Sequence, residues 1–385
     1  MRKGPFMDRL FLYVVLAMCL FFTVAAAQTE QSGCFLTRLG SDTVAVEEFS
    51  IGVHGLHGTS VSRSPRTTIR EYSGTFNPDG NLKDFHLTAR LPNGTVMYDR
   101  NFVYSNDSVR VTVKQDTVTT HYAVASHERP FPLFFDMFGG WQVILQHAAG
   151  TNHFDVVSGK RVMHYTIEGK FPGKFDLTTA PGDFGPLRVE TDNDGRIEKF
   201  DMTATTDKFL VERIPAVDVK MMAKEFAGRE QSGRSLGILS PKDSVRTEIN
   251  GAHLKIDYCR PAARGRTVFG GVVTWDSVWR TGANAATQLV TDKELRFGQT
   301  SLPPGTYTLF TIPGKDRWSL IINSQHGQWG TDYDQSKDFA RLPMDVKKNT
   351  DMTERFTISV EPGANQGVLH LVWEYTDASI AFTVQ

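Results

Sequence analysis

Short stretches in which apolar and polar residues alternate run through most of the chain. Residues 110–114 and 356–360 are typical, with Val, Ile or Phe at every second position. A period of two residues places apolar side chains on one face of a strand, and β-branched and aromatic residues favour extended backbone. The pattern therefore predicts a mainly β protein.

Turn signals separate these stretches at short intervals. They lie at residues 77–80, 92–94, 192–195 and 303–305, where Gly follows Pro, Asn or Asp. Gly and Asn tolerate the positive φ that tight hairpins require. Strands that follow one another so closely favour antiparallel pairing over βαβ units.

Two plausible helices and a polar linker divide the chain. Helices are expected over residues 132–149, weakened by Gly139-Gly140, and over residues 216–227. Residues 228–237 are polar and glycine-rich, which is typical of a linker. We expect an N-terminal antiparallel sheet with one or two packed helices, ending in a helix and linker (28–235), and a C-terminal antiparallel β-sandwich (236–385).

The first 27 residues predict a secretory signal peptide. A basic start precedes an apolar run at 10–24 and a small-residue cleavage site at 25–27. An uncleaved anchor is the alternative, because the run approaches the ~18 residues of a membrane helix. After cleavage we expect a secreted or periplasmic protein without a stable membrane span.

Overall charge and cysteine content add little. The net charge is −1, which gives no electrostatic case for nucleic acid as a partner. Cys34 and Cys259 are the cysteines outside the signal. They could form one bridge in an oxidising compartment, but their spacing does not require it, and two unpaired cysteines are the preferred interpretation.

Positive charge is concentrated between residues 255 and 290. This segment holds five cations and two anions, which are Lys255, Arg260, Arg264, Arg266, Arg280, Asp257 and Asp276. Guanidinium groups from two neighbouring strands could bind a carboxylate, phosphate or sulfate, with Asn284 adding an amide. The alternative is structural, because a buried Arg without a partner costs several kcal/mol and needs a carboxylate. The partners available for such pairs are Glu354, Glu374, Asp332 and Asp338.

Tryptophans gather in the same half of the chain. Trp318 and Trp373 lie in apolar strands and are expected in the core, whereas Trp279 and Trp329 lie beside glycines and polar residues. We therefore predict a site for a small anionic or carbohydrate-like ligand. Its residues are Arg260, Arg264, Arg266, Trp279, Arg280 and Asn284.

Long motifs in this half carry a family resemblance. They include residues 258–266, Phe269-Gly270, residues 278–284 and residues 302–307. From residue 240 onward the chain resembles a bacterial family of secreted proteins of unknown function, DUF2911. The resemblance implies architecture and the location of a site but no activity. Cys259 and Ala262 stand where serines are expected, and Ala285 where an acidic residue is usual; residues 28–235 resemble no family.

No complete catalytic motif, metal-binding set or cofactor motif is found. Residues 233–237 match a nucleophile-elbow pattern but lack the strand before and the helix after that it requires. A noncatalytic binding module is therefore preferred over the alternative, a hydrolase acting on cell-envelope or extracellular material. A second alternative gives the N-terminal domain an apolar ligand in a cavity lined by Phe134, Phe135, Phe138 and Trp141.

Overall fold

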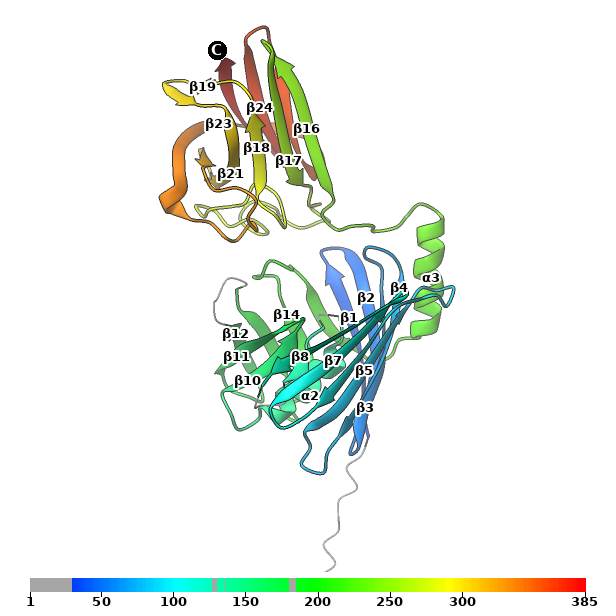
Figure 1. The fold of residues 1–385 in the computed structure, drawn as a ribbon. Helices are drawn as coiled ribbons and strands as arrows, with labels where there is room; N and C mark the ends of the chain where they lie inside the picture. The colour runs from blue at the N-terminus through cyan, green and yellow to red at the C-terminus, as the bar shows by residue number, and fades with distance from the viewer. Residues whose placement is uncertain (1–29, 127–129, 135, 180–184) are drawn as a thin grey trace, which may run out of the picture.

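The computed structural model describes residues 30–126, 130–134, 136–179 and 185–385 (Figure 1). The signal peptide expected at residues 1–27 lies outside this part of the chain. Strands make up most of the described residues, so the prediction of a mainly β protein is confirmed. No helix within the described ranges is long and apolar enough to cross a membrane.

Within the described ranges, the N-terminal strands form one sheet of 15 strands. β1 lies inside it, with β2 to β8 following on one side and β15 back to β9 on the other. The bounds are β1 Gln31–Leu39, β2 Asp42–Gly52, β3 Gly55–Ser62, β4 Thr68–Phe76, β5 Leu82–Arg90, β6 Val96–Tyr104, β7 Ser108–Gln115, β8 Val118–Ala125, β9 Phe131–Pro132, β10 His153–Ser158, β11 Arg161–Gly169, β12 Lys174–Thr179, β13 Leu187–Thr191, β14 Ile197–Asp201 and β15 Leu210–Ile214.

One strand pair corrects the expectation of a wholly antiparallel sheet. β9 and β10 are parallel. The helix α2 (Phe138–His147) connects them, and a crossover of this kind returns the chain in the same direction. The helix expected over residues 132–149 is therefore shorter, because Pro132 belongs to β9 and α2 begins only at Phe138.

The sheet curves around α2. Phe138 contacts Phe35 of β1 at 5.8 Å between ring centroids, and Trp141 contacts Phe154 of β10 and Phe200 of β14. These partners lie on β1 and on the arm that runs from β15 to β9, and residues 138–145 of the helix are all buried. α2 is thus the centre of the N-terminal core, which explains why its sequence is apolar on every side.

A buried carboxylate marks the start of α2. Glu47 of β2 accepts hydrogen bonds from the backbone N–H of Phe138 (2.6 Å) and of Gly139 (3.1 Å), and from the Tyr72 hydroxyl (2.5 Å). The first amides of a helix have no partner within it, so a carboxylate there satisfies them. Burial nevertheless raises the pKa of Glu47 to about 8.

The second helix covers the outer face of the same sheet. α3 (Val219–Gln231) packs Val219, Ala223 and Phe226 against Val46 of β2 and Val61 of β3. It runs four residues beyond the expected end at residue 227. Glu230 in its last turn accepts a hydrogen bond from the backbone N–H of Thr67 at 2.8 Å, which ties this end to the sheet. The connection to the next strand therefore begins at residue 232.

The C-terminal strands form one sheet of nine rather than two separate sheets. Their order is β16-β17-β18-β21-β22-β23-β24-β19-β20. The long strand β23 joins the two parts, because residues 338–344 pair with β22 and residues 345–362 pair with β24. The bounds are β16 Lys242–Ile249, β17 Ala252–Cys259, β18 Thr287–Thr291, β19 Leu295–Phe297, β20 Thr300–Leu302, β21 Gly305–Pro313, β22 Trp318–Asn323, β23 Asp338–Pro362 and β24 Gln366–Val384.

The core of this second sheet is aromatic. Trp318 and Trp373 are each 1% exposed, as the sequence pattern predicts, and Phe356 is fully buried beside them. Trp279 packs against this cluster from the connection between β17 and β18, with its ring 5.9 Å from that of Trp373. The connection is thereby fixed to the core at one point.

Candidate functional site

The two domains meet where the turn between β1 and β2 contacts the connection between β17 and β18. The Ser41 backbone N–H donates to the Arg264 carbonyl at 3.0 Å, and the Arg264 guanidinium pairs with Asp42. Gly40 has φ +60, and a Cβ there would collide with the Arg264 carbonyl oxygen. This close approach of two backbones sets the position of one domain against the other.

A cleft of about 610 Å³ lies beside this contact and is lined by both domains. From the N-terminal domain come Leu39 and the turn between β14 and β15. That turn lies next to the end of β1, because Arg38 pairs with Leu210 in the antiparallel register. The opposite wall comes from the 260–286 connection and from residues near 330. Four charged side chains among the described residues line the cleft, and they are Asp207, Lys208, Arg266 and Arg280.

These four charges influence one another across the domain boundary. Burial lowers the pKa of Lys208, and the positive charges of Arg266 and Arg280 lower it further. Burial also raises the pKa of Asp207, while the charge of Arg280 opposes that rise. The described residues of the cleft therefore place three cations and one carboxylate in a partly desolvated setting.

Arg280 is the least satisfied of the cations. Its Nη1 is buried without a hydrogen-bond partner, and no ion pair of its side chain is found within the described part of the chain. Burial lowers the pKa of Arg280, and Cys259 and Asp207 oppose that shift. A buried donor without an acceptor carries a desolvation cost that a bound anion would remove.

The backbone around Arg280 is shaped to hold it in this position. Thr281 is fully buried with φ 51, a strained conformation for a β-branched residue. Its hydroxyl donates to the Thr311 hydroxyl at 3.2 Å, which fixes the strained residue against β21. A Cβ at Gly330 would collide with Cδ of Arg280, so glycine there leaves space for the arginine.

The structure brings four of the six predicted ligand residues into the cleft. They are Arg266, Trp279, Arg280 and Asn284. They share one long connection rather than lying on two neighbouring strands, as the sequence had suggested. Arg266 donates from Nε to the Ala263 carbonyl at 2.9 Å and from Nη2 to the Ala262 carbonyl at 2.8 Å, so its described hydrogen bonds leave the positive charge uncompensated.

The other two predicted residues do not line the cleft. Arg260 donates to Asp243 at 3.0 Å and to the Thr357 hydroxyl at 2.8 Å, whereas Arg264 pairs with Asp42. Both arginines therefore have structural partners, although these are not the carboxylates that the sequence suggested for such pairs. We assign Arg260 to the scaffold of the C-terminal domain and Arg264 to the domain contact.

Asp207 and Lys208 were missed at the sequence level. They lie in a polar turn about 60 residues before the arginines. Lys208 has φ 63, which no feature of its own sequence signals. Their place in the site follows from how the domains pack, so sequence spacing offered no way to find them.

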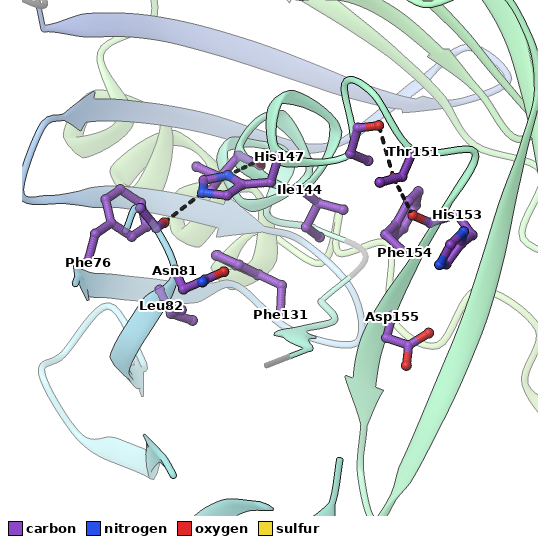
Figure 2. Close-up of a pocket in the computed structure, with 13 residues that line it drawn as sticks. Phe76, Asn81, Leu82, Phe131, Ile144, His147, Thr151, His153, Phe154 and Asp155 are labelled. Carbon is purple, nitrogen blue, oxygen red and sulfur yellow. Dashed lines mark hydrogen bonds between the residues drawn. The ribbon is translucent and has the colours of Figure 1, made fainter. Parts of the chain in front are cut away.

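A second cavity of about 400 Å³ lies within the N-terminal domain. Figure 2 shows Phe76 and Asn81 near the β4–β5 turn, Phe154 on the opposite side, and Phe131 and Ile144 between them. The His147 ring nitrogens lie 3.0 Å from the Val143 carbonyl oxygen and 2.6 Å from that of Gly80, which ties α2 to this turn.

This cavity is not the one that the sequence suggested for an apolar ligand. Phe138 and Trp141 are each 1% exposed and packed in the core, and Phe134 packs against Phe85 and Phe102. The side chain of Phe135 lies outside the described residues. The second cavity lies instead at the far end of α2.

Other candidate chemistry finds little support. No group of three or more His, Cys, Asp or Glu suited to a metal ion occurs within the described ranges. Cys34 and Cys259 are unpaired and belong to different domains. Residues 233–237 lie in the connection after α3, so the element directly before Ser235 is a helix and not the strand that a nucleophile elbow requires.

Comparisons with known proteins bear on the C-terminal domain. Residues 240–382 match the family model described as "Protein of unknown function (DUF2911)". The resemblance seen in the sequence is confirmed. The matched region thus contains Arg266, Trp279, Arg280 and Asn284, while Asp207 and Lys208 come from a region that no family model matches. No curated protein matches the chain.

Two solved structures show a distant likeness. A β-barrel-like protein of domain of unknown function DUF1849 from Brucella abortus is 10% identical over 48% of this chain and 93% of that one, with a TM-score of 0.31. A chain described in a structural and mechanistic analysis of two prolyl endopeptidases is 9% identical over 94% of this chain and 49% of that one, with a TM-score of 0.16. Neither likeness bears on the function of this protein.

Proposed function

We propose that this protein is a noncatalytic binding module that takes a small anionic ligand in the cleft between its domains. The observation that carries the proposal is the buried Nη1 of Arg280, which has no partner among the described residues and lies at the wall of a cleft of about 610 Å³. Arg266 and Lys208 add positive charge beside it. A carboxylate, phosphate or sulfate would supply the acceptor that Arg280 lacks.

The walls of the cleft also suit the body of a carbohydrate-like ligand. Trp279 offers an aromatic surface, and its Nε1 already donates to the Gly282 carbonyl at 3.0 Å, so the ring is held in one orientation. Thr206, Ser277 and Thr331 place hydroxyl groups along the walls. Sites that combine apolar surface with a few polar groups are typical for small molecules. The expected secreted or periplasmic location belongs to the same proposal.

The hydrolase alternative has less support. Asp207 is the one carboxylate among the described residues that line the cleft. Hydrolysis by paired carboxylates needs a second acid or base close by. Binding without catalysis is therefore the function that the described geometry supports best.

The proposal is tested by thermal shift with the purified protein and inorganic phosphate, sulfate, acetate and glucuronate. At 100 times its dissociation constant, a bound anion stabilises the fold by about 2.7 kcal/mol, which gives a readable rise in melting temperature. We expect Arg280→Ala to abolish the rise. Arg260→Ala is the matched control, because that arginine has its own partner Asp243 and lies outside the cleft.

A rise that survives Arg280→Ala would refute this location for the site. A protein that none of the four anions stabilises would contradict the proposed function itself.

A further inference from the structure

The three cations of the cleft approach it from separate places. Lys208 comes from the β14–β15 turn, and its Nζ donates to the Thr203 carbonyl at 3.1 Å. Arg266 and Arg280 come from the other domain, 14 positions apart in one connection. A planar carboxylate presents two oxygens in one plane, which a single guanidinium can occupy completely. A tetrahedral oxyanion presents three terminal oxygens in three directions and can contact all three cations.

The net charge of the cleft also favours a tetrahedral dianion over a carboxylate. Its described residues hold three cations against the single carboxylate Asp207, a surplus of two positive charges. Arg266 and Arg280 both oppose the charge on Lys208, so the cations repel one another across the domain boundary. A phosphate monoester carries a charge of about −1.5 to −2 at pH 7, whereas a carboxylate carries a charge of about −1. A dianion would compensate the surplus and relieve this repulsion.

We infer that the anionic group recognised in the cleft is a phosphate monoester, bound jointly by Lys208 of the N-terminal domain and by Arg266 and Arg280 of the DUF2911 domain. This inference rests on the proposed function and narrows its ligand to one chemical class. The phosphoryl group lies between the domains, and the organic part of the ligand lies toward Trp279 and Val278, which provide the apolar surface beside the cations.

The experiment compares three probes that differ in their charged group. Phenyl phosphate, phenyl sulfate and benzoate share an aromatic body and are titrated into the protein by isothermal calorimetry at pH 7.5. The first is a tetrahedral dianion, the second a tetrahedral monoanion and the third a planar monoanion. We expect phenyl phosphate to bind at least about tenfold more tightly than either of the others, because it offers an acceptor oxygen that benzoate lacks and a second negative charge that phenyl sulfate lacks.

Variants assign that preference to individual cations. Lys208→Ala is expected to reduce phenyl phosphate affinity about tenfold and to change benzoate affinity much less, because benzoate can be held by the arginines alone. Lys199→Ala is the control in the same domain. Its ammonium pairs with Asp201, and it does not line the cleft. Melting curves of both variants establish that each is folded.

The outcomes separate the two proposals. Equal affinity for all three probes, abolished by Arg280→Ala, would overturn the phosphate inference and leave an anion site in place. A preference for phenyl phosphate that Lys208→Ala leaves intact would also overturn the joint site. Binding of none of the probes, or binding that no cleft variant changes, would contradict the proposed function as well.

Discussion

The buried carboxylate of Glu47 makes the stability of the N-terminal domain depend on pH. Its pKa rises from an ordinary value of 4.5 to about 8 because burial disfavours the charged form. Between these values the folded protein keeps a proton that the unfolded chain has released. Stability from this group is therefore fully present below pH 4.5 and is lost as the pH rises through 8. At about 1.4 kcal/mol for each pH unit, the full loss is at most about 5 kcal/mol.

The perturbation is Glu47→Gln, which keeps the shape of the protonated acid and removes its titration. The helix start loses part of its cap, because one amide N–H of α2 now faces the Gln NH₂ group, so the variant starts about 1 kcal/mol less stable at low pH. As pH rises, the wild-type protein loses stability and the variant does not. We expect the two stability curves to converge and then cross.

The assay follows unfolding of this domain alone. Trp141 is the one tryptophan of the chain before residue 275, so 5-fluorotryptophan labelling gives the N-terminal core its own fluorine signal. Urea unfolding at pH 5, 6.5 and 8 then yields the free energy of unfolding for wild type, Glu47→Gln and the control Glu48→Gln, which alters the half-buried neighbour. Parallel pH profiles for wild type and Glu47→Gln would refute the reasoning.

Two further predictions concern the cleft and the domain contact. Gly330→Ala should displace Arg280, cost about 1–3 kcal/mol of stability and weaken phenyl phosphate binding as Arg280→Ala does. Unchanged binding, measured by calorimetry, would show that Arg280 is not positioned by this glycine. Arg264→Ala should cost about 1–3 kcal/mol, because it removes the partner of Asp42 at the domain contact. It should also increase the radius of gyration in small-angle X-ray scattering, whereas Arg260→Ala should leave that radius unchanged.

The strands and turns could be predicted from sequence because their signals are local. The alternation at residues 110–114 and the Asp-Gly turn at residues 194–195 report the backbone directly, and both occur as expected. The parallel β9–β10 pair could not be anticipated, since it depends on how far α2 carries the chain. The continuous nine-stranded sheet depends in the same way on the length of β23, which contains no glycine between residues 338 and 362.

Only part of the candidate site could be predicted from sequence, again because only local signals can be read from it. A surplus of arginine identifies a charged segment, but it does not show which arginines already have partners. Arg260 is paired within its own domain by Asp243, 17 residues earlier, and Arg264 is paired by Asp42, 222 residues earlier. Neither separation along the chain indicates which carboxylate pairs with which arginine. No described carboxylate forms an ion pair with Arg266 or Arg280, which leaves both for the ligand of the proposed function.

The division of roles among the arginines follows from where the domain contact lies. Arg264 joins the domains at the β1–β2 turn, and the adjacent β14–β15 turn then places Lys208 opposite Arg280. The contact made by Arg264 thus positions the unpaired Arg266 and Arg280 so that they face Lys208 of the other domain. Like charges held close together destabilise a structure when no counter-ion is present. Here they are held close together by the domain contact of Arg264, which lies two residues before Arg266. In the function proposed above, a bound anion offsets this cost, so ligand binding and domain association should stabilise each other. The anion that satisfies Arg280 would then also strengthen the contact made by Arg264.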